Sequence, residues 1–209
     1  MRLLDLFCGA GGAAMGYHRA GFEVVGVDIN PQPHYPFEFH QADALTFPLD
    51  GYDAIHASPP CQAYSSATPA DRVHPDLYAP TRDRLTGLGV PYVIENVIGA
   101  PYSHGFVLCG SMFDMKVQRH RNFETSWMQL MPLYCDHSGD RPITVSGNRG
   151  VPDARGVVDY KHSRQSPMSW WPELMGMPWA APLETKEAIP PVYTEWIGRQ
   201  LMTVLERAA

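Results

Sequence analysis

Residues 3–12 read LLDLFCGAGG, an apolar run that passes directly into a glycine-rich stretch. Leu3–Phe7 has the length and composition of a short buried strand, and Ala13–Ala20 has a helical pattern that ends at Gly21. Glycines in a turn between strand and helix let the backbone approach a ligand closely and leave the amide groups of the helix N-terminus free. The stretch therefore predicts an α/β fold whose first loop contributes to a binding site.

The alternation of strands and helices continues over the first hundred residues. Strand-like runs follow at Glu23–Val27, Tyr52–Ala57 and Val90–Ile94. A helical pattern at Leu77–Leu88 precedes the last of them. Such an order is typical of a mostly parallel, twisted sheet with helices on both faces. From Gly105 onward the pattern weakens, and residues 132–167 contain one clear strand candidate, ITVS at 143–146. An amphipathic helix is predicted over Thr194–Glu206.

The bulk composition is that of a globular protein. The 209 residues are 44% hydrophobic and 18% charged, and no apolar run reaches the ~20 residues that a membrane span needs. The apolar start runs straight into the glycine loop, so no signal peptide is expected. The four cysteines lie far apart and form no CxxC pair, which favours a reducing cytosol over a disulfide framework or a zinc ribbon.

No metal site is expected from the cysteines and histidines. Cys135 and His137 lie two residues apart, but together with the distant His162 they fall short of a zinc-binding pattern. Cys8 and Cys109 are interpreted as packing residues, because free cysteine is commonly buried.

The net charge of −6 is distributed unevenly along the chain. Residues 1–115 carry 5 basic residues (Lys and Arg) and 12 acidic residues (Asp and Glu). Residues 116–165 carry 8 basic and 5 acidic residues, and residues 166–209 carry 3 basic and 5 acidic residues. Only the middle segment has a positive balance. If the chain binds nucleic acid, the phosphates are therefore expected to lie against this segment.

Acidic residues follow two further strand-like runs. Asp28 comes seventeen residues after Gly11 and ends its strand, where a carboxylate can accept hydrogen bonds from ribose hydroxyls. Asp43, in QADAL, ends a third predicted strand, where it can meet an adenine edge. With the glycines, these acids indicate a nucleotide-containing cofactor. A dinucleotide such as NAD fits the glycine pattern alone, whereas Asp5 and Phe7 favour a methyl-donor site.

A thiol follows two prolines in SPPCQ at 58–62. Proline fixes its own φ and removes a backbone donor, so Pro59 and Pro60 end the preceding strand and stiffen the turn. Cys61 is then either a small packed residue or a nucleophile held in a fixed direction.

Taken together, these segments resemble the motifs of the cytosine-C5 DNA methyltransferases, which use S-adenosylmethionine. The likeness covers most of the chain in the family's order. The similar segments are DLFCGAGG (5–12), VDIN (27–30), QAD (41–43), SPPCQAYS (58–65), IENV (94–97), QRHRNFE (118–124), LMGMPW (174–179) and EAIPPVYTEWIGRQL (187–201). Any single motif is weak, but Pro-Cys-Gln and Glu-Asn-Val in this order behind DLFCGAGG form a strong signature.

The resemblance implies a Rossmann-like, S-adenosylmethionine-dependent methyltransferase fold with a small irregular recognition region. Residues 1–125 would form the cofactor-binding and catalytic domain, residues 126–167 a minimal target-recognition region, and residues 168–209 a C-terminal return to the catalytic domain. The implied partner is double-stranded DNA, bound by a monomer in a bacterial or phage-infected host cytosol. This compactness suits a phage-encoded or accessory restriction-modification enzyme.

The resemblance also assigns chemistry to four residues. Cys61 would add to C6 of a flipped-out cytosine, and Glu95 would donate a hydrogen bond or proton at N3. Arg121 would hold the cytosine O2, while Arg119 would support the loop or a phosphate. The base that removes the C5 proton is not identified by the sequence.

The remaining assignments concern binding. The cofactor-binding residues that the resemblance implies are Asp5, Phe7, Gly9, Gly11, Gly12, Asp28, Ile29, Asp43, Ala44 and Pro60. The expected substrate-binding residues are Gln62, Ser65 and Asn96, with Arg141, Arg149, Arg155, Lys161 and Arg164 from the recognition region.

The chain departs from the family pattern in three places. Val117 stands where the arginine motif has glutamine, and Lys186-Glu187 replaces the usual Gly-Asn pair of the last motif. Only about fifty residues separate QRHRNFE from LMGMPW, the interval that holds the family's target-recognition domain. So short a segment predicts a short or relaxed target sequence and a salt-sensitive affinity.

Three alternative functions remain open from the sequence. SPP at 58–60 also resembles the start of the Ser-Pro-Pro-aromatic motif of N4-cytosine and N6-adenine methyltransferases, although Cys61 takes the place of the aromatic residue. The altered arginine and last motifs leave room for a catalytically silent DNA- or partner-binding relative. A C5 methyltransferase that acts on RNA or single-stranded DNA is compatible with the short recognition segment.

Overall fold

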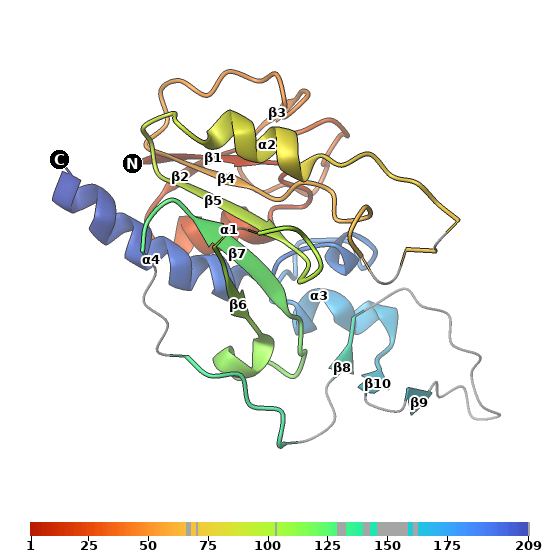
Figure 1. Ribbon diagram of the computed structural model, residues 1–209. Coiled ribbons are helices and arrows are strands. Elements are labelled where there is room, and N and C mark those ends of the chain that lie inside the picture. Colours follow the sequence, from red (N-terminus) through yellow and green to blue (C-terminus); the bar gives the residue numbers. More distant parts are fainter. Residues whose placement is uncertain are drawn as a thin grey trace.

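A seven-stranded sheet forms the centre of the molecule (Figure 1). The computed structural model describes residues 1–65, 68–69, 71–102, 104–128, 133–139, 143–145, 159–160 and 163–208. The strands of the sheet are β1 Arg2–Leu6, β2 Glu23–Asp28, β3 Glu38–Gln41, β4 Ala54–Ala57, β5 Tyr92–Asn96, β6 Phe106–Leu108 and β7 Arg121–Thr125. Their order across the sheet is β3-β2-β1-β4-β5-β7-β6.

Helices and short 3-10 turns connect and cover these strands. The helices are α1 Gly12–Arg19, α2 Tyr78–Leu85, α3 Trp171–Leu174 and α4 Pro191–Ala208, and the 3-10 turns are η1 Gly110–Phe113, η2 Met168–Trp170 and η3 Glu184–Lys186. The amphipathic helix predicted near the end of the sequence is confirmed as α4. None of the helices in the described ranges is long and apolar enough to cross a membrane.

Most strand pairings in the sheet are parallel. β1 pairs in parallel with β2 and β4, which places Leu4 beside Val25 on one side and Ile55 on the other. β3 and β5 extend this parallel set, whereas β7 runs antiparallel to both β5 and β6. The predicted α/β class with a mostly parallel sheet is therefore confirmed. The β6–β7 pair was not predicted, because the sequence pattern weakens after residue 105.

The two faces of the sheet are buried under different helices. Side chains alternate between faces along a strand, so Leu3 packs with α1 and α4 while Leu4 packs with α2. Tyr17 of α1 and Tyr193 of α4 belong to the first cluster, and Tyr78 of α2 belongs to the second. Figure 1 shows α2 on one side of the sheet and α1 with α4 on the other. The expected three-layer arrangement follows from this alternation.

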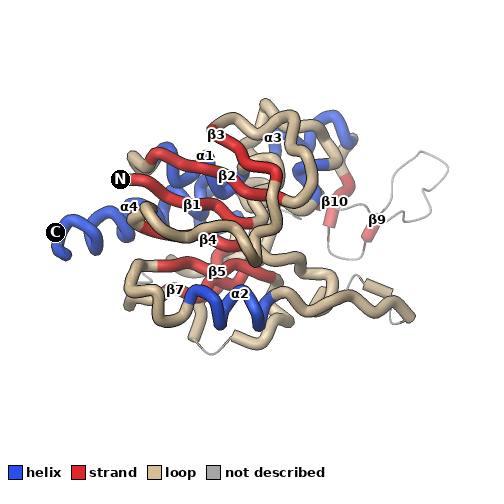
Figure 2. Tube along the Cα trace, turned by 90° about the horizontal axis from the view of Figure 1, so that it is seen from above, coloured by secondary structure: helices blue, strands red, loops and turns tan. Residues whose placement is uncertain are grey.

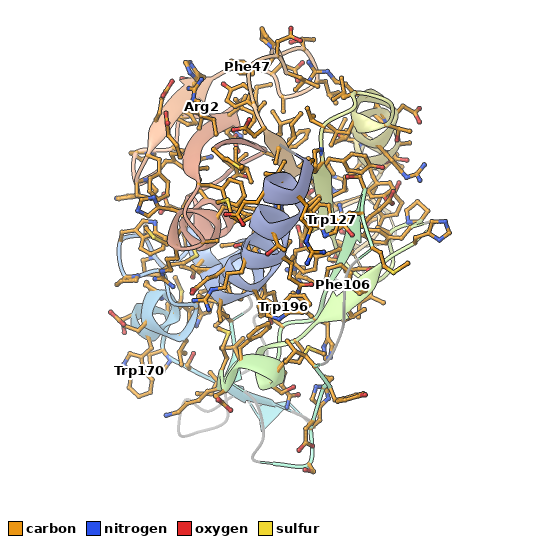
Figure 3. All side chains as sticks on the ribbon, turned by 90° about the vertical axis from the view of Figure 1, so that its left-hand side faces the viewer. Arg2, Phe47, Phe106, Trp127, Trp170 and Trp196 are labelled. Carbon is orange, nitrogen blue, oxygen red and sulfur yellow. The ribbon has the colours of Figure 1, made fainter. Side chains whose placement is uncertain are left out.

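Helix α4 lies directly against α1, because small residues line the contact. A Cβ on Gly16 would collide with the side chain of Thr194 and the carbonyl of Pro191. The Thr194 hydroxyl donates a hydrogen bond to the Ala13 carbonyl at 2.9 Å. Further along α4, Trp196 packs edge-on against Phe106 of β6, and Figure 3 shows the two rings beside one another.

A second, three-stranded sheet lies apart from the main one. Its strands are β8 Ile143–Thr144, β9 Asp159–Tyr160 and β10 Ser163–Gln165, in the order β8-β10-β9. β8 confirms the strand predicted at ITVS. Figures 1 and 2 place this small sheet on the side where the parallel strands of the main sheet end. The three short strands, which belong to the segment predicted to recognise the target, therefore lie beyond the carboxyl edge of the main sheet.

Candidate active site

A cavity of about 390 Å³ opens at the carboxyl ends of β1, β2, β4 and β5. Ligands of open α/β folds bind at this edge of the sheet. Many of the site residues predicted from the sequence line this cavity, namely Asp5, Phe7, Gly9, Gly12, Asp28, Ile29, Pro60, Cys61, Gln62, Glu95 and Arg121. The fold thus gathers residues as far apart in the sequence as Asp5 and Arg121 into one site.

The glycine loop after β1 forms one wall of the cavity. Gly11 caps α1 in the left-handed conformation, with φ 82°, which a residue with a side chain rarely adopts. Phe7 is also left-handed, with φ 59°, although it carries a side chain. For a residue with a side chain, such as Phe7, this conformation costs roughly 1–3 kcal/mol and is found preferentially at functional sites. Asp28 fixes the loop, because its carboxylate accepts hydrogen bonds from the amides of Gly9 at 3.1 Å and Asn30 at 2.9 Å.

Asp5 lies on the floor of the cavity without a partner. Its side chain is fully buried, and neither carboxylate oxygen has a hydrogen-bond partner among the described residues. Burial raises the pKa of Asp5 well above its usual range, and the negative charge of Asp28 raises it further. The nearby Ala14 amide offsets part of this shift without completing a hydrogen bond. An unpaired buried carboxylate of this kind is costly unless a ligand supplies the missing donors.

The turn that carries Cys61 is held from the neighbouring strand. The Asn96 side chain at the end of β5 donates a hydrogen bond to the Pro59 carbonyl at 2.8 Å and accepts one from the Val97 amide at 2.9 Å. Because β4 and β5 are paired, this bond fixes the proline turn relative to Glu95. Asn96 therefore positions the turn rather than lining the cavity.

The Cys61 thiol is half-buried and faces groups of both charges. Burial raises its pKa, the positive charge of Arg121 opposes that rise, and Glu95 and Glu187 add to it. Among these groups Arg121 favours the thiolate, the form that acts as a nucleophile. The thiol is thus placed in the cavity within the electrostatic reach of one cation and two acids.

Glu95 and Arg121 form an ion pair across two adjacent strands. Arg121 Nε lies 3.0 Å from Glu95 Oε1, and both side chains line the cavity. Burial raises the pKa of Glu95, while Arg121 and, more weakly, Arg119 lower it. The antiparallel register of β5 and β7, with Asn96 opposite Asn122, explains why the two side chains meet.

A buried chain of hydrogen bonds reaches Glu95 from below the sheet. Tyr17 Oη lies 3.0 Å from His56 Nδ1, and His56 Nε2 lies 2.8 Å from the Ser58 hydroxyl, which in turn bonds Glu95. Burial lowers the pKa of His56 to about 3, so the ring is neutral and has one donor and one acceptor nitrogen. The sequence reasoning missed these residues. Ser58, the serine of SPPCQ, was the feature of the sequence that could have indicated them.

Arg119 lies behind the cavity and does not line it. Its guanidinium donates hydrogen bonds to the carbonyls of Val145, at 3.3 Å, and of Lys186. The Arg119 carbonyl accepts a hydrogen bond from the Tyr193 hydroxyl at 2.6 Å. Burial lowers the pKa of Arg119 to about 9, and the charge of Arg121 contributes. These contacts fit the expected support of a loop, since they join β8, the last motif and α4.

Several predicted site residues lie away from the cavity lining. Asp43 is exposed and its carboxylate accepts a hydrogen bond from the Leu45 amide at 2.9 Å, while Ala44 is buried in the core beside α2. Gly11 and Ser65 are near the site but do not line it. Arg141, Arg149, Arg155 and Lys161 lie outside the described residues, as does the side chain of Arg164, whose backbone belongs to β10.

The last motif contributes cavity residues that the sequence reasoning did not assign. Glu187 and Ile189 of this motif, with Leu183 and Glu184 just before it, line the wall opposite the glycine loop. Glu187 belongs to the pair that replaces the family's usual Gly-Asn, so this departure puts a carboxylate into the site. The Gly12 position approaches the Ile189 carbonyl so closely that no Cβ could fit between them.

Comparisons with known proteins agree with this arrangement. The family model of the C-5 cytosine-specific DNA methylases matches residues 1–74. No curated protein matches the chain. A solved structure described as a DNA modification methyltransferase encoded within a prophage (E. coli) is similar with a TM-score of 0.63 and 15% identity, covering 99% of both chains. The structure of the S. pombe Dnmt2 methyltransferase is similar with a TM-score of 0.65 and 13% sequence identity, covering 98% of this chain and 99% of that one. The structure of the Entamoeba histolytica methyltransferase EhMeth is similar with a TM-score of 0.63 and 13% sequence identity, covering 98% of both chains.

Proposed function

We propose that this chain, which resembles the C-5 cytosine-specific DNA methylases in sequence and methyltransferases in fold, is a DNA (cytosine-5)-methyltransferase. The observation that carries the proposal is the meeting of Cys61, Glu95 and Arg121 in one cavity that also contains the glycine loop. A nucleophile, an acid and a cation beside a nucleotide-type loop are the groups that methylation of a cytosine ring carbon requires.

The cofactor of the matched family, S-adenosylmethionine, fits the donor and acceptor groups of the glycine-loop wall. Asp5 offers two unpaired carboxylate oxygens to the ammonium or hydroxyl groups of such a ligand. Asp28 retains lone pairs for ribose hydroxyls although each of its oxygens already accepts one amide. When bound, S-adenosylmethionine supplies an electrophilic methyl group.

Cys61 supplies the nucleophile in this proposal. Cytosine C5 is a poor nucleophile, and addition of the Cys61 thiolate to C6 converts the ring into an enamine whose C5 is electron-rich. The methyl group is then transferred to C5, a base removes the C5 proton, and the C5–C6 double bond reforms as the thiolate leaves. Because a base within a duplex hides its C6 face, the cytosine must first flip out of the helix, at a cost of a few kcal/mol.

Glu95 and Arg121 would stabilise the ring while it carries negative charge. The raised pKa of Glu95 favours a protonated carboxyl that can donate to N3 as charge develops there. The hydrogen bond from Ser58 to the same carboxyl fixes its orientation. Arg121, ion-paired with Glu95 and lining the cavity, would hold the cytosine O2.

The DNA would approach over the edge of the sheet at which the cavity opens. In this proposal a monomer acts on double-stranded DNA in the cytosol, and residues 126–167 contact the target. The positive balance of residues 116–165 supports this orientation. The short segment again leads us to propose a short or relaxed target sequence, with an affinity that falls steeply as salt rises.

Nucleoside mass spectrometry of unmethylated duplex DNA incubated with the protein and S-adenosylmethionine tests the reaction. We expect C5-methylcytosine, and none from Cys61→Ala, which must still bind the cofactor in calorimetry to serve as a folded control. N4-methylcytosine or N6-methyladenine would overturn the mechanism. Product on single-stranded DNA or RNA alone would change the substrate class, and no product on any of them would favour the binding-only alternative.

A duplex with 5-fluorocytosine at the target tests the covalent step separately. Fluorine at C5 blocks the final proton removal, so the bond between Cys61 Sγ and C6 should persist after methyl transfer. We expect a stable protein–DNA adduct that peptide mass spectrometry maps to Cys61. An active enzyme without this adduct would rule out Cys61 as the nucleophile.

A further inference from the structure

Two cysteines and two histidines from three separate segments meet at the end of the β6–β7 pair. Cys109 follows β6, His120 immediately precedes β7, and Cys135 and His137 lie in the segment 133–139. One ligand atom from each of the four side chains lies within 4.8 Å of every other. We propose that these four residues bind one zinc ion.

The distances within this cluster suit a tetrahedral metal centre. His120 Nε2 lies 3.3 Å from Cys135 Sγ, and His137 Nε2 lies 3.4 Å from Cys109 Sγ. With Zn–S near 2.3 Å and Zn–N near 2.0–2.1 Å, a tetrahedral ion separates sulfur and nitrogen ligands by roughly 3.5 Å. The closest pair, Cys135 Sγ and His137 Nε2 at 2.7 Å, needs to open by only about 1 Å to meet this value.

The donor set selects the metal. Two thiolates and two imidazoles in tetrahedral geometry favour zinc over magnesium, calcium or manganese, which prefer oxygen ligands. The Ser111 hydroxyl lies 3.4 Å from Cys109 Sγ and 3.5 Å from Cys135 Sγ, so its one proton can be donated to either sulfur. Hydrogen bonds of this kind stabilise metal-bound thiolates.

The site is structural, because four protein ligands complete the tetrahedron and leave no open position for a substrate. Cys109 is buried, whereas Cys135 and His137 are exposed, so the ion can enter from solvent. The zinc would tie the segment 133–139, which precedes β8, to the end of the catalytic sheet.

The zinc ion would also influence the candidate active site, through its ligand His120. His120 is adjacent to Arg121 in the chain, and Arg121 Nη1 donates a hydrogen bond to the His120 carbonyl at 2.9 Å. A zinc ion on the His120 ring would fix the backbone from which Arg121 extends toward Glu95. The ion is therefore inferred to hold the cation of the site in place while anchoring the start of the recognition region.

Metal analysis of the full-length protein tests the proposal. After expression in zinc-supplemented medium and removal of loosely bound metal, we expect one zinc per chain by plasma mass spectrometry. Cys135→Ser and His137→Asn should each reduce the zinc content at least tenfold, and Cys61→Ser, which changes a cysteine outside the cluster, should leave it at one. Both ligand substitutions are at exposed positions, and circular dichroism of each variant checks that loss of zinc does not result from misfolding.

Cobalt substitution identifies the ligands independently of any activity. The Co²⁺ protein should show thiolate-to-metal charge transfer and the d–d bands of a tetrahedral site, and Cys135→Ser should weaken the charge transfer. A zinc content below a tenth of an equivalent per chain after reconstitution with excess zinc would overturn the proposal. A disulfide between Cys109 and Cys135 in the protein as isolated would also overturn it. Full zinc in the Cys135→Ser variant would overturn the ligand assignment. Because metal content does not depend on methyl transfer, this proposal and the proposed function fail separately.

Discussion

The Arg121 guanidinium lies 3.0 Å from the Glu95 carboxylate, and the two side chains are only 16% and 7% exposed. A pair this deeply buried is costly to form, and removing one partner leaves an uncompensated charge. The pair nevertheless occupies the cavity that also holds the Cys61 thiol. The two residues thus present an acid and a cation to whatever ring enters the site.

Glu95→Gln should abolish most methyl transfer without weakening cofactor binding. The amide cannot deliver a proton to the cytosine N3, so we expect kcat to fall about 10²–10⁴-fold. Cofactor affinity, measured by calorimetry, should stay within about twofold. Glu124→Gln is the matched control, since Glu124 is a buried acid paired with Arg82 and Tyr78 outside the cavity. Equal losses of kcat in both variants would contradict the role of Glu95.

Asp5→Asn should stabilise the free protein while weakening the cofactor complex. The buried carboxylate has no partner among the described residues, so a neutral amide should raise the free energy of unfolding by about 1–2 kcal/mol. For a chain of this size that is a rise in Tm of roughly 2–4 °C per kcal/mol. Calorimetry with and without S-adenosylmethionine measures both effects.

The stability gained by Asp5→Asn should depend on pH. The pKa of Asp5 is raised in the folded state, so the folded protein binds this proton more tightly than the unfolded chain does. The advantage of asparagine should therefore be full above the raised pKa, decline as the pH falls below it, and be lost only below the ordinary pKa that the aspartate has in the unfolded chain. An advantage that grows on acidification would contradict this explanation.

Glu187→Gln should make Cys61 more reactive at a given pH. The negative charge of Glu187 contributes to the raised pKa of the thiol, so its removal should shift the iodoacetamide alkylation profile to lower pH. Glu184→Gln is the control, because Glu184 lines the same cavity but is paired with His34. Identical profiles for wild type and Glu187→Gln would show that the two groups are not coupled.

Gly16→Ala should destabilise the protein by about 3 kcal/mol, since an added methyl group forces α1 and α4 apart. Chemical denaturation measures the loss. Gly139→Ala, at an exposed position with open space around a Cβ and no left-handed φ, should change stability by less than about 0.5 kcal/mol. A Gly16→Ala variant as stable as this control would mean that the helices can separate freely.

The first hundred residues of the fold were predictable from sequence, and the reasons are local. LLDLFCGAGG predicts a strand and a glycine turn that leads into a helix, and Cys61 follows two prolines that fix its turn. β6 and β7 were missed because three to five residues of mixed character give no clear period. Glu187 and Ile189 were not assigned to the site, because only the packing of α4 on α1 brings them opposite the glycine loop. The cysteine–histidine cluster was missed because its four members belong to three segments that meet only in the folded chain, at the end of the β6–β7 pair.

The hydrogen bond from Thr194 to the Ala13 carbonyl joins residues 181 positions apart in the chain. Contacts of such long range form late in folding, since the intervening chain must lose entropy before they can form. During synthesis, helix α1 emerges from the ribosome long before its partner, and the wall that carries Glu187 and Ile189 cannot close against the glycine loop until α4 follows. A nascent chain that lacks α4 should therefore be unable to retain the cofactor. Binding competence would arise only after α4 has been translated, as the chain grows by about 5–20 residues per second.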